Sequence, residues 1–107
     1  MSEFGQHSVN KVEYHPKADR ELASAVVYYE QQQPGLGRDF LAEVQAVLLM
    51  IADHPESGAR VHDTEFRRLG LRRFPYLVVY RVLQGKIRVV AVAHGKHRPG
   101  YWISRHS

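Results

Sequence analysis

The stretch that decides the fold is YLVVYRVL-QG-KIRVVAVAH, which covers residues 76–94. Two runs rich in β-branched and aromatic residues are separated by Gln84-Gly85, a pair with glycine at its second position. Such a pair is typical of a tight turn between two antiparallel strands. We therefore predict a β-hairpin with strands over 76–83 and 86–94, in which the turn sets the pairing of the strands.

The predicted pairing places apolar side chains on both faces of the hairpin. If Leu83 lies opposite Lys86, the pairs continue through Arg81–Arg88 to Leu77–Val92. The first face then carries Tyr76, Val78, Tyr80, Val82, Ile87, Val89 and Ala91. The second face carries Leu77, Val79, Arg81, Arg88, Val90, Val92 and His94.

The chain before the hairpin predicts two helices and two further strands. Residues 9–14 alternate as a short strand does, and Pro16 suits the first turn of an amphipathic helix over 16–33. The breaker Pro34-Gly35-Leu36-Gly37 precedes a second amphipathic helix, which ends before His54-Pro55. Residues 56–65 are typical of a loop and 67–74 of a strand. The order β-α-α-β-β-β predicts an α+β domain with a helical hairpin packed on one face of a mainly antiparallel sheet.

A single helical hairpin can cover only one face of this sheet. The second face would expose an apolar patch of a size that monomeric proteins rarely tolerate. Arg81 and Arg88 would also repel each other across the strands, and an acidic group from outside would relieve that repulsion. We therefore predict a partner segment with apolar and acidic residues on this face. The alternatives are that a loop or the C-terminal tail covers the face, or that two copies associate through it. The predicted contacts are Leu77, Val79, Arg81, Arg88, Val90 and Val92.

The composition indicates one small globular domain in a reducing compartment. A chain of 107 residues suffices for one domain. It contains no cysteine, which excludes disulfides and thiolate metal sites and favours the cytoplasm. No apolar run is long enough to span a membrane, and the first ten residues lack the apolar core of a signal peptide. We expect a flexible tail over 1–8, a domain over 9–103 and a C-terminal tail over 104–107.

Charge is distributed unevenly along the chain. Residues 1–58 contain four Lys/Arg and nine Asp/Glu, whereas residues 59–107 contain eleven Lys/Arg and two Asp/Glu. A basic C-terminal half suggests an anionic partner, either nucleic acid or an acidic protein segment. The alternative is a solvated basic sheet.

Several short motifs, taken in order, resemble one family. They are Tyr28-Tyr29-Glu30, Pro34-Gly35-Leu36-Gly37 with Phe40 and Glu43, Arg73-Phe74-Pro75-Tyr76 with Val78-Val79-Tyr80, and Ala91-Val92-Ala93-His94 with Arg98-Pro99 and Tyr101-Trp102. Over about residues 9–102 the chain resembles the RelE/ParE toxin superfamily, closest to the ParE-like plasmid stabilisation toxins. The resemblance implies a type II toxin held inactive by a cognate antitoxin, whose C-terminal segment wraps around the toxin in a hetero-oligomer.

The superfamily divides by mechanism. RelE-like members are ribosome-dependent mRNA endonucleases, and ParE-like members are described as inhibitors of DNA gyrase. RelE-like enzymes typically have an arginine where Leu77 stands here, and a guanidinium can stabilise charge that develops on a phosphate. Leucine cannot do this, so the resemblance favours gyrase inhibition. The alternatives are the endonuclease and an inactive or non-toxic basic binding module.

The densest group of chemically active side chains follows the last strand. A histidine beside Arg and Lys could act as a general acid or base on RNA, and the catalytic candidates are His94, His97, Arg98 and Tyr101. The alternative is a basic tail that binds without chemistry. Tyr101 and Trp102 could stack on bases or pack on the sheet. His94 and His97 lack a third ligand, so no metal is expected, and no cofactor motif is present. The candidates for contact with the target are Arg72, Arg73, Lys96, Arg98 and Trp102.

Overall fold

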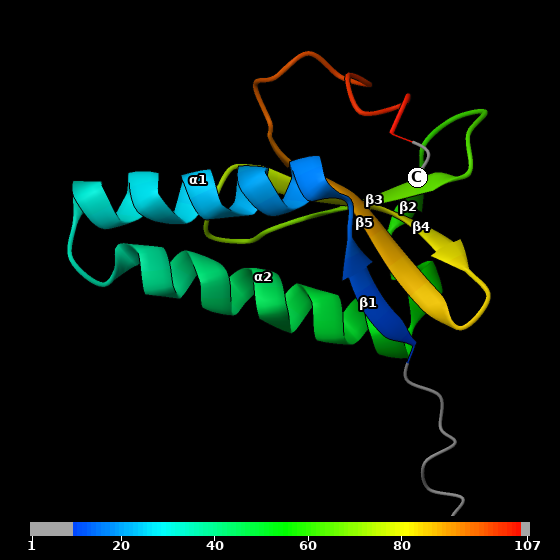
Figure 1. Ribbon diagram of the computed structural model, residues 1–107, viewed down its shortest axis with the longest axis horizontal. Helices are drawn as coiled ribbons and strands as arrows, with labels where there is room; N and C mark the ends of the chain where they lie inside the picture. Colours follow the sequence, from blue (N-terminus) through cyan, green and yellow to red (C-terminus); the bar gives the residue numbers. More distant parts are fainter. Residues whose placement is uncertain (1–9, 106–107) are drawn as a thin grey trace, which may run out of the picture.

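The computed structural model describes residues 10–105, so the tail expected over 1–8 lies outside the described residues. Within these residues, two α-helices pack on a five-stranded sheet. Figure 1 shows the helices lying along one side of the sheet. The helices are α1 (Pro16–Gln32) and α2 (Leu36–Asp53), followed by the short 3-10 helix η2 (Pro55–Ser57). The strands are β1 (Lys11–Tyr14), β2 (Ala59–Arg60), β3 (Phe66–Gly70), β4 (Tyr76–Leu83) and β5 (Lys86–His94).

The predicted α+β class and the helical hairpin on a mainly antiparallel sheet are confirmed. Among residues 10–105 the sheet order is β1-β5-β4-β3-β2, and only the β1–β5 pair is parallel. The prediction that residues 56–65 form only a loop is wrong, because η2 ends within this range and β2 lies inside it. Strand β2 forms there because Ala59 and Arg60 pair with Arg68 and Arg67 of β3.

Glu30 holds the tight connection between the two helices. Its carboxylate accepts hydrogen bonds from the backbone N–H of Gly35 (3.0 Å) and of Gly37 (3.1 Å), which satisfies donors at the start of α2. Gly35 has φ 90°, which favours glycine, and a Cβ at Gly37 would lie 2.5 Å from the carbonyl oxygen of Val26. The two glycines therefore allow α1 and α2 to lie side by side, with their connected ends extending beyond the sheet (Figure 1).

The predicted pairing of the hairpin is correct near the turn and wrong beyond it. Leu83–Lys86 through Tyr80–Val89 pair as predicted, but the register then shifts between Val79 and Tyr80, so that Val79 faces Ala91 and Leu77 faces Ala93. Val90 is the extra residue of a β-bulge on β5. The bulge moves Val92 to the core beneath the helices, and Ala91 to the opposite face.

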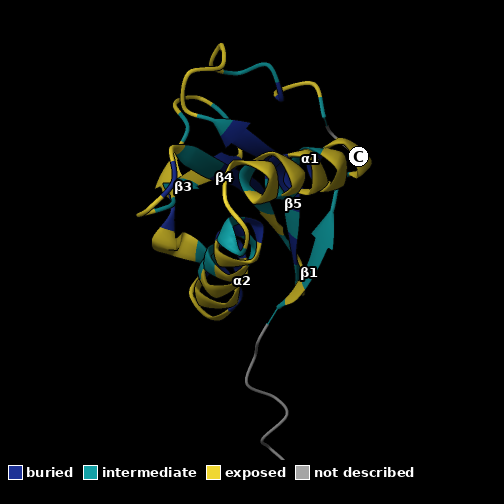
Figure 2. Ribbon diagram, turned by 90° about the vertical axis from the view of Figure 1, so that its left-hand side faces the viewer, coloured by how far each residue is buried: buried dark blue, intermediate teal, exposed yellow. Residues whose placement is uncertain are grey.

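The expectation that the second face of the hairpin lies open to a partner is also wrong. Val79 and Val90 are 0% exposed, because a second apolar cluster forms on this face from segments distant in the chain. After β5 the chain arches over α1 and returns to the sheet near β2 and β3 (Figure 1). The Trp102 ring thereby packs against Phe66, with ring centroids 5.2 Å apart. The alternative in which the C-terminal tail covers the face is the one that the structure shows. Val78, Val79 and Tyr80 of β4 are buried, and Figure 2 shows buried segments within the sheet.

The repulsion expected between Arg81 and Arg88 is relieved within the chain. The two arginines do face each other across β4 and β5. Glu65 lies 3.2 Å from Arg81, and Glu13 lies 3.5 Å from Arg88. No acidic group from outside is needed, because the loop before β3 and strand β1 each supply a carboxylate.

Within residues 10–105, no helix combines the length and the apolar character needed to cross a membrane.

Candidate functional site

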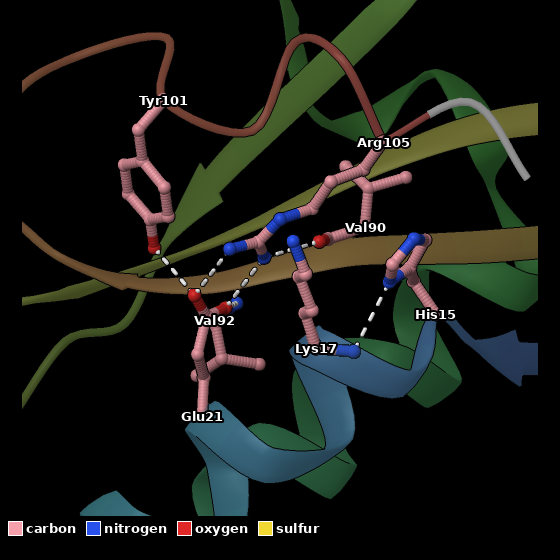
Figure 3. Close-up of polar contacts among 7 residues, drawn as sticks. All are labelled: His15, Lys17, Glu21, Val90, Val92, Tyr101 and Arg105. Carbon is pink, nitrogen blue, oxygen red and sulfur yellow. Dashed lines mark hydrogen bonds and ion pairs between the residues drawn. The ribbon is translucent and has the colours of Figure 1, made fainter.

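Glu21 is the centre of a polar network that joins α1, β5 and the C-terminal segment. One carboxylate oxygen accepts from the backbone N–H of Val92 (3.0 Å) and from Arg105 (3.0 Å). The other accepts from the Tyr101 hydroxyl (2.9 Å) and from the second terminal nitrogen of Arg105 (2.9 Å). Figure 3 shows these groups converging from the helix, the strand and the C-terminal segment.

The network lies where β1 ends and the edge of β5 would otherwise be unpaired. The last link from the end of β1 is the hydrogen bond from His15 N–H to the carbonyl oxygen of Val89 (2.8 Å). Arg105 donates to the next edge carbonyl, that of Val90, at 2.9 Å, and Glu21 accepts from Val92. Buried backbone groups need such partners. The two side chains therefore continue the edge pairing of β5 beyond β1, and Arg105 does so from within the segment 104–107 that was expected to be a tail.

Tyr101 is held in its neutral form. Burial and the hydrogen bond to Glu21 raise the pKa of Tyr101 well above that of a free tyrosine. The guanidinium of Arg105 lies over the Tyr101 ring, 4.9 Å from its centroid. The hydroxyl is thus a donor fixed on a carboxylate, and its proton is not readily removed.

Positive charge gathers at the start of α1. Partial burial lowers the pKa of His15, and the nearby Arg105, Arg88, Lys17 and Arg20 lower it further. In Figure 3 the Lys17 side chain extends from α1 toward the Arg105 guanidinium, and His15 Nδ1 accepts from Lys17 N–H at 3.0 Å. Of these cations, Arg105 is paired with Glu21 and Arg88 with Glu13.

The four catalytic candidates lie in one region after β5. The ring centroids of His94 and His97 are 5.8 Å apart, and those of His97 and Tyr101 are also 5.8 Å apart. His94 Nδ1 accepts from Lys96 N–H at 3.0 Å. Arg98 is exposed and lines a hollow of about 300 Å³ with Glu21, His97 and Tyr101. The structure therefore brings these residues together, although Tyr101 is already bonded to Glu21.

The candidates for target contact lie in different places. Lys96 and Arg98 are exposed in the segment after β5, and Arg72 and Arg73 are exposed between β3 and β4. Trp102 is buried in the second cluster, so the interpretation that it packs on the sheet is confirmed. Because Trp102 is buried, the five candidates for target contact do not share one surface patch.

A groove between α2 and β3 was missed at the level of sequence. It has a volume of about 730 Å³, and its apolar lining includes Val47 and Met50 of α2 and Leu69 of β3. Its rim carries charged residues: the backbone N–H groups of Arg72 and Arg73 donate to Glu43, and Arg73 lies 3.5 Å from Asp39. The sequence did contain a sign of this exposed apolar surface, because Leu49 and Met50 widen the apolar stripe of α2. In the structure their exposed fractions are 70% and 43%.

No group of three potential metal ligands is found among residues 10–105.

Comparisons with known proteins give two findings. The family model described as "ParE toxin of type II toxin-antitoxin system, parDE" matches residues 12–99. A solved structure titled "Chromosomal ParDE TA system from P. aeruginosa" has a TM-score of 0.69 and 17% sequence identity, and the match covers 80% of this chain and 96% of that chain. At this identity the likeness shows the fold. The search of curated proteins gives no match.

Proposed function

Because this chain belongs to the ParE toxin family of type II toxin–antitoxin systems, we propose that it arrests growth by inhibiting DNA gyrase and that a cognate antitoxin neutralises it. The observation that carries the choice of target is the residue at position 77. In the RelE-like ribonucleases that the chain resembles, an arginine typically stands there. Leu77 packs beside the second apolar cluster and carries no charge that could stabilise a phosphate during RNA cleavage.

The state of Tyr101 gives further support. A tyrosine acting as a general base must give up its proton, and its catalytic pKa should lie near the working pH. Burial and the bond to Glu21 raise the pKa of Tyr101 instead. The Tyr101 hydroxyl is therefore better suited to binding than to acid–base chemistry.

For contact with gyrase we propose the exposed cations of the basic half. Arg72 and Arg73 lie between β3 and β4, and Lys96 and Arg98 lie beyond β5. Trp102 supports this surface from beneath, because its buried ring anchors the segment that carries Lys96 and Arg98.

For contact with the antitoxin we propose the groove between α2 and β3. Among the residues first assigned to this contact, Val79, Val90 and Val92 are interior, whereas Leu77, Arg81 and Arg88 keep partial exposure. Leu77 itself packs beside the second apolar cluster, on the opposite face of the sheet from Leu69, which lines the groove. An antitoxin segment with an apolar stripe would cover Val47, Met50 and Leu69.

The test measures supercoiling and RNA cleavage side by side. The purified chain is added to gyrase with relaxed plasmid and ATP, and separately to ribosomes translating a defined mRNA. We expect supercoiling to stop and the mRNA to stay intact, and we expect the product of the neighbouring gene to restore supercoiling. Unaffected gyrase together with mRNA cut on translating ribosomes would overturn the proposal in favour of the endonuclease. If the chain neither inhibits gyrase nor causes mRNA cleavage, and its expression does not arrest growth, the alternative of a non-toxic binding module would be favoured.

A further inference from the structure

A second cleft lies between α1 and the segment that follows β5. Its volume is about 590 Å³. One side is a single stripe of α1 that includes Lys17, Arg20, Ser24 and Tyr28, and the opposite side includes Tyr76 and His97. The gyrase and antitoxin proposals use none of the α1 residues of this stripe.

One end of the cleft is positively charged. Lys17 and Arg20 are exposed, and no carboxylate within hydrogen-bonding distance of either is found among residues 10–105. Glu21 also lines the cleft, but Arg105 and Tyr101 already occupy both of its oxygens. The unneutralised charge that faces a ligand at this end is therefore positive.

The other end of the cleft is aromatic. Tyr28 is 52% exposed, although a tyrosine ring on a helix surface would gain from being covered. It is not loose, because its ring packs edge-on against Tyr29 at a centroid distance of 5.1 Å. Tyr76 is half-buried on the opposite side, edge-on to His94 at 5.1 Å. The cleft thus ends in a fixed platform of aromatic rings.

The distance between the two ends suits a short strand. Arg20 and Tyr28 are eight positions apart on one helix, which at about 1.5 Å per residue is about 12 Å. This is the length of about three to four nucleotides at about 3.4 Å each. A strand of about three to four stacked nucleotides therefore reaches both the cations and the rings.

From this arrangement we infer that the cleft binds single-stranded nucleic acid, with phosphates against Lys17 and Arg20 and bases stacked on Tyr28 and Tyr76. A cationic groove with aromatic platforms is the usual design for binding single strands, because the faces of bases are free only when the bases are unpaired. This inference goes beyond the proposed action on gyrase, since it concerns a different surface and requires no cleavage. It holds whether the strand is DNA or RNA.

Fluorescence anisotropy with labelled oligonucleotides tests the inference. The purified chain is titrated into a single strand of DNA, one of RNA and a DNA duplex, each of about twelve nucleotides per strand. We expect one or both single strands to bind more tightly than the duplex, and the comparison of DNA with RNA identifies the preferred sugar. Two phosphate contacts should weaken binding about sevenfold between about 50 and 200 mM salt, since each contributes about 0.7 to the logarithmic slope.

Substitutions in the cleft separate specific binding from general attraction to a basic protein. The double variant Lys17→Ala/Arg20→Ala should lose most of this salt dependence. Its matched control is Lys11→Ala/Arg38→Ala, which removes two exposed cations that do not line the cleft. Tyr28→Ala should weaken binding about tenfold through loss of stacking, whereas Tyr28→Phe, which keeps the ring, should bind like the parent. The neighbouring Val27→Ala is the control for a change on the same turn of α1.

All the substituted positions, in α1 and in the control double, are exposed, so thermal unfolding should show that every variant is folded. Tighter binding of the duplex, equal weakening by the cleft and control doubles, or no effect of Tyr28→Ala would each overturn the inference. Because none of these residues belongs to the proposed gyrase surface, failure here leaves inhibition of supercoiling intact, and failure of that assay leaves strand binding intact.

Discussion

The carboxylate of Glu21 and the guanidinium of Arg105 together extend the edge pairing of strand β5 beyond the end of β1. They form two hydrogen bonds with each other, and each also binds one backbone group of β5, at Val92 and Val90. An unpaired strand edge is a site where other chains can add. The pair closes this edge with side chains, and it fixes the C-terminal segment that covers the second face of the hairpin.

Removing either member of this pair should destabilise the fold. We expect Glu21→Ala to lower the free energy of unfolding by about 2–3 kcal/mol, because it leaves the largely buried guanidinium of Arg105 without its carboxylate and the backbone N–H of Val92 unpaired. Chemical denaturation followed by circular dichroism measures the change. Glu56→Ala, at an exposed carboxylate, is the control and should stay within about 0.5 kcal/mol of the parent. Equal stability of the two variants would show that the pair contributes nothing.

The cap of α1 should make stability depend on pH. The pKa of His15 is lowered in the folded chain, so the unfolded chain binds a proton more readily, and stability should fall as the pH drops below 6.5. The same protonation removes the Nδ1 lone pair that accepts from Lys17 N–H. His15→Asn keeps a capping oxygen without the titration, so its loss of stability between about pH 7 and 5 should be smaller by up to about 1 kcal/mol. His62→Asn, at an exposed histidine, is the control, and a parent-like pH profile for His15→Asn would contradict the explanation.

The sequence predicted the elements well because their signals are local. The turn at Gln84-Gly85 set the first pairs of the hairpin, and Pro16 and His54-Pro55 marked helix ends. The sequence did not predict the register beyond Tyr80, because a bulge depends on packing against both faces of the sheet and the turn does not determine that packing. The Glu21–Arg105 contact joins positions 84 residues apart, so no local pattern could predict it. Trp102, an apolar ring beyond the last strand, was the one available sign that the second face was covered.

Charge placed on the second face of the hairpin should unfold the chain. Val79 and Val90 are interior, so Val79→Lys/Val90→Lys buries two unpaired ammonium groups at a cost of several kcal/mol, comparable to the total stability of a small domain. We expect loss of cooperative thermal unfolding. Val79→Ala should fold but lose about 2 kcal/mol. A double-lysine variant that stays folded and loses only antitoxin binding would show that this face is open in solution after all.

A single charge in the groove between α2 and β3 should separate antitoxin binding from stability. Met50 is 43% exposed and lines the groove, so Met50→Glu should leave the fold intact and place a carboxylate where the apolar stripe of the antitoxin is proposed to lie. We expect binding to the neighbouring gene product to weaken at least tenfold in titration calorimetry, since truncation or desolvation at the centre of an interface costs about 2 kcal/mol or more.

Val27→Glu on the outer side of α1 is the matched control, because it adds the same charge at an exposed apolar position outside the groove. Because Arg72 and Arg73 of the proposed gyrase surface also line this groove, inhibition of supercoiling by the Met50 variant is measured beside its antitoxin binding. Undiminished antitoxin binding by Met50→Glu, or equal weakening by Val27→Glu, would place the antitoxin elsewhere on the chain.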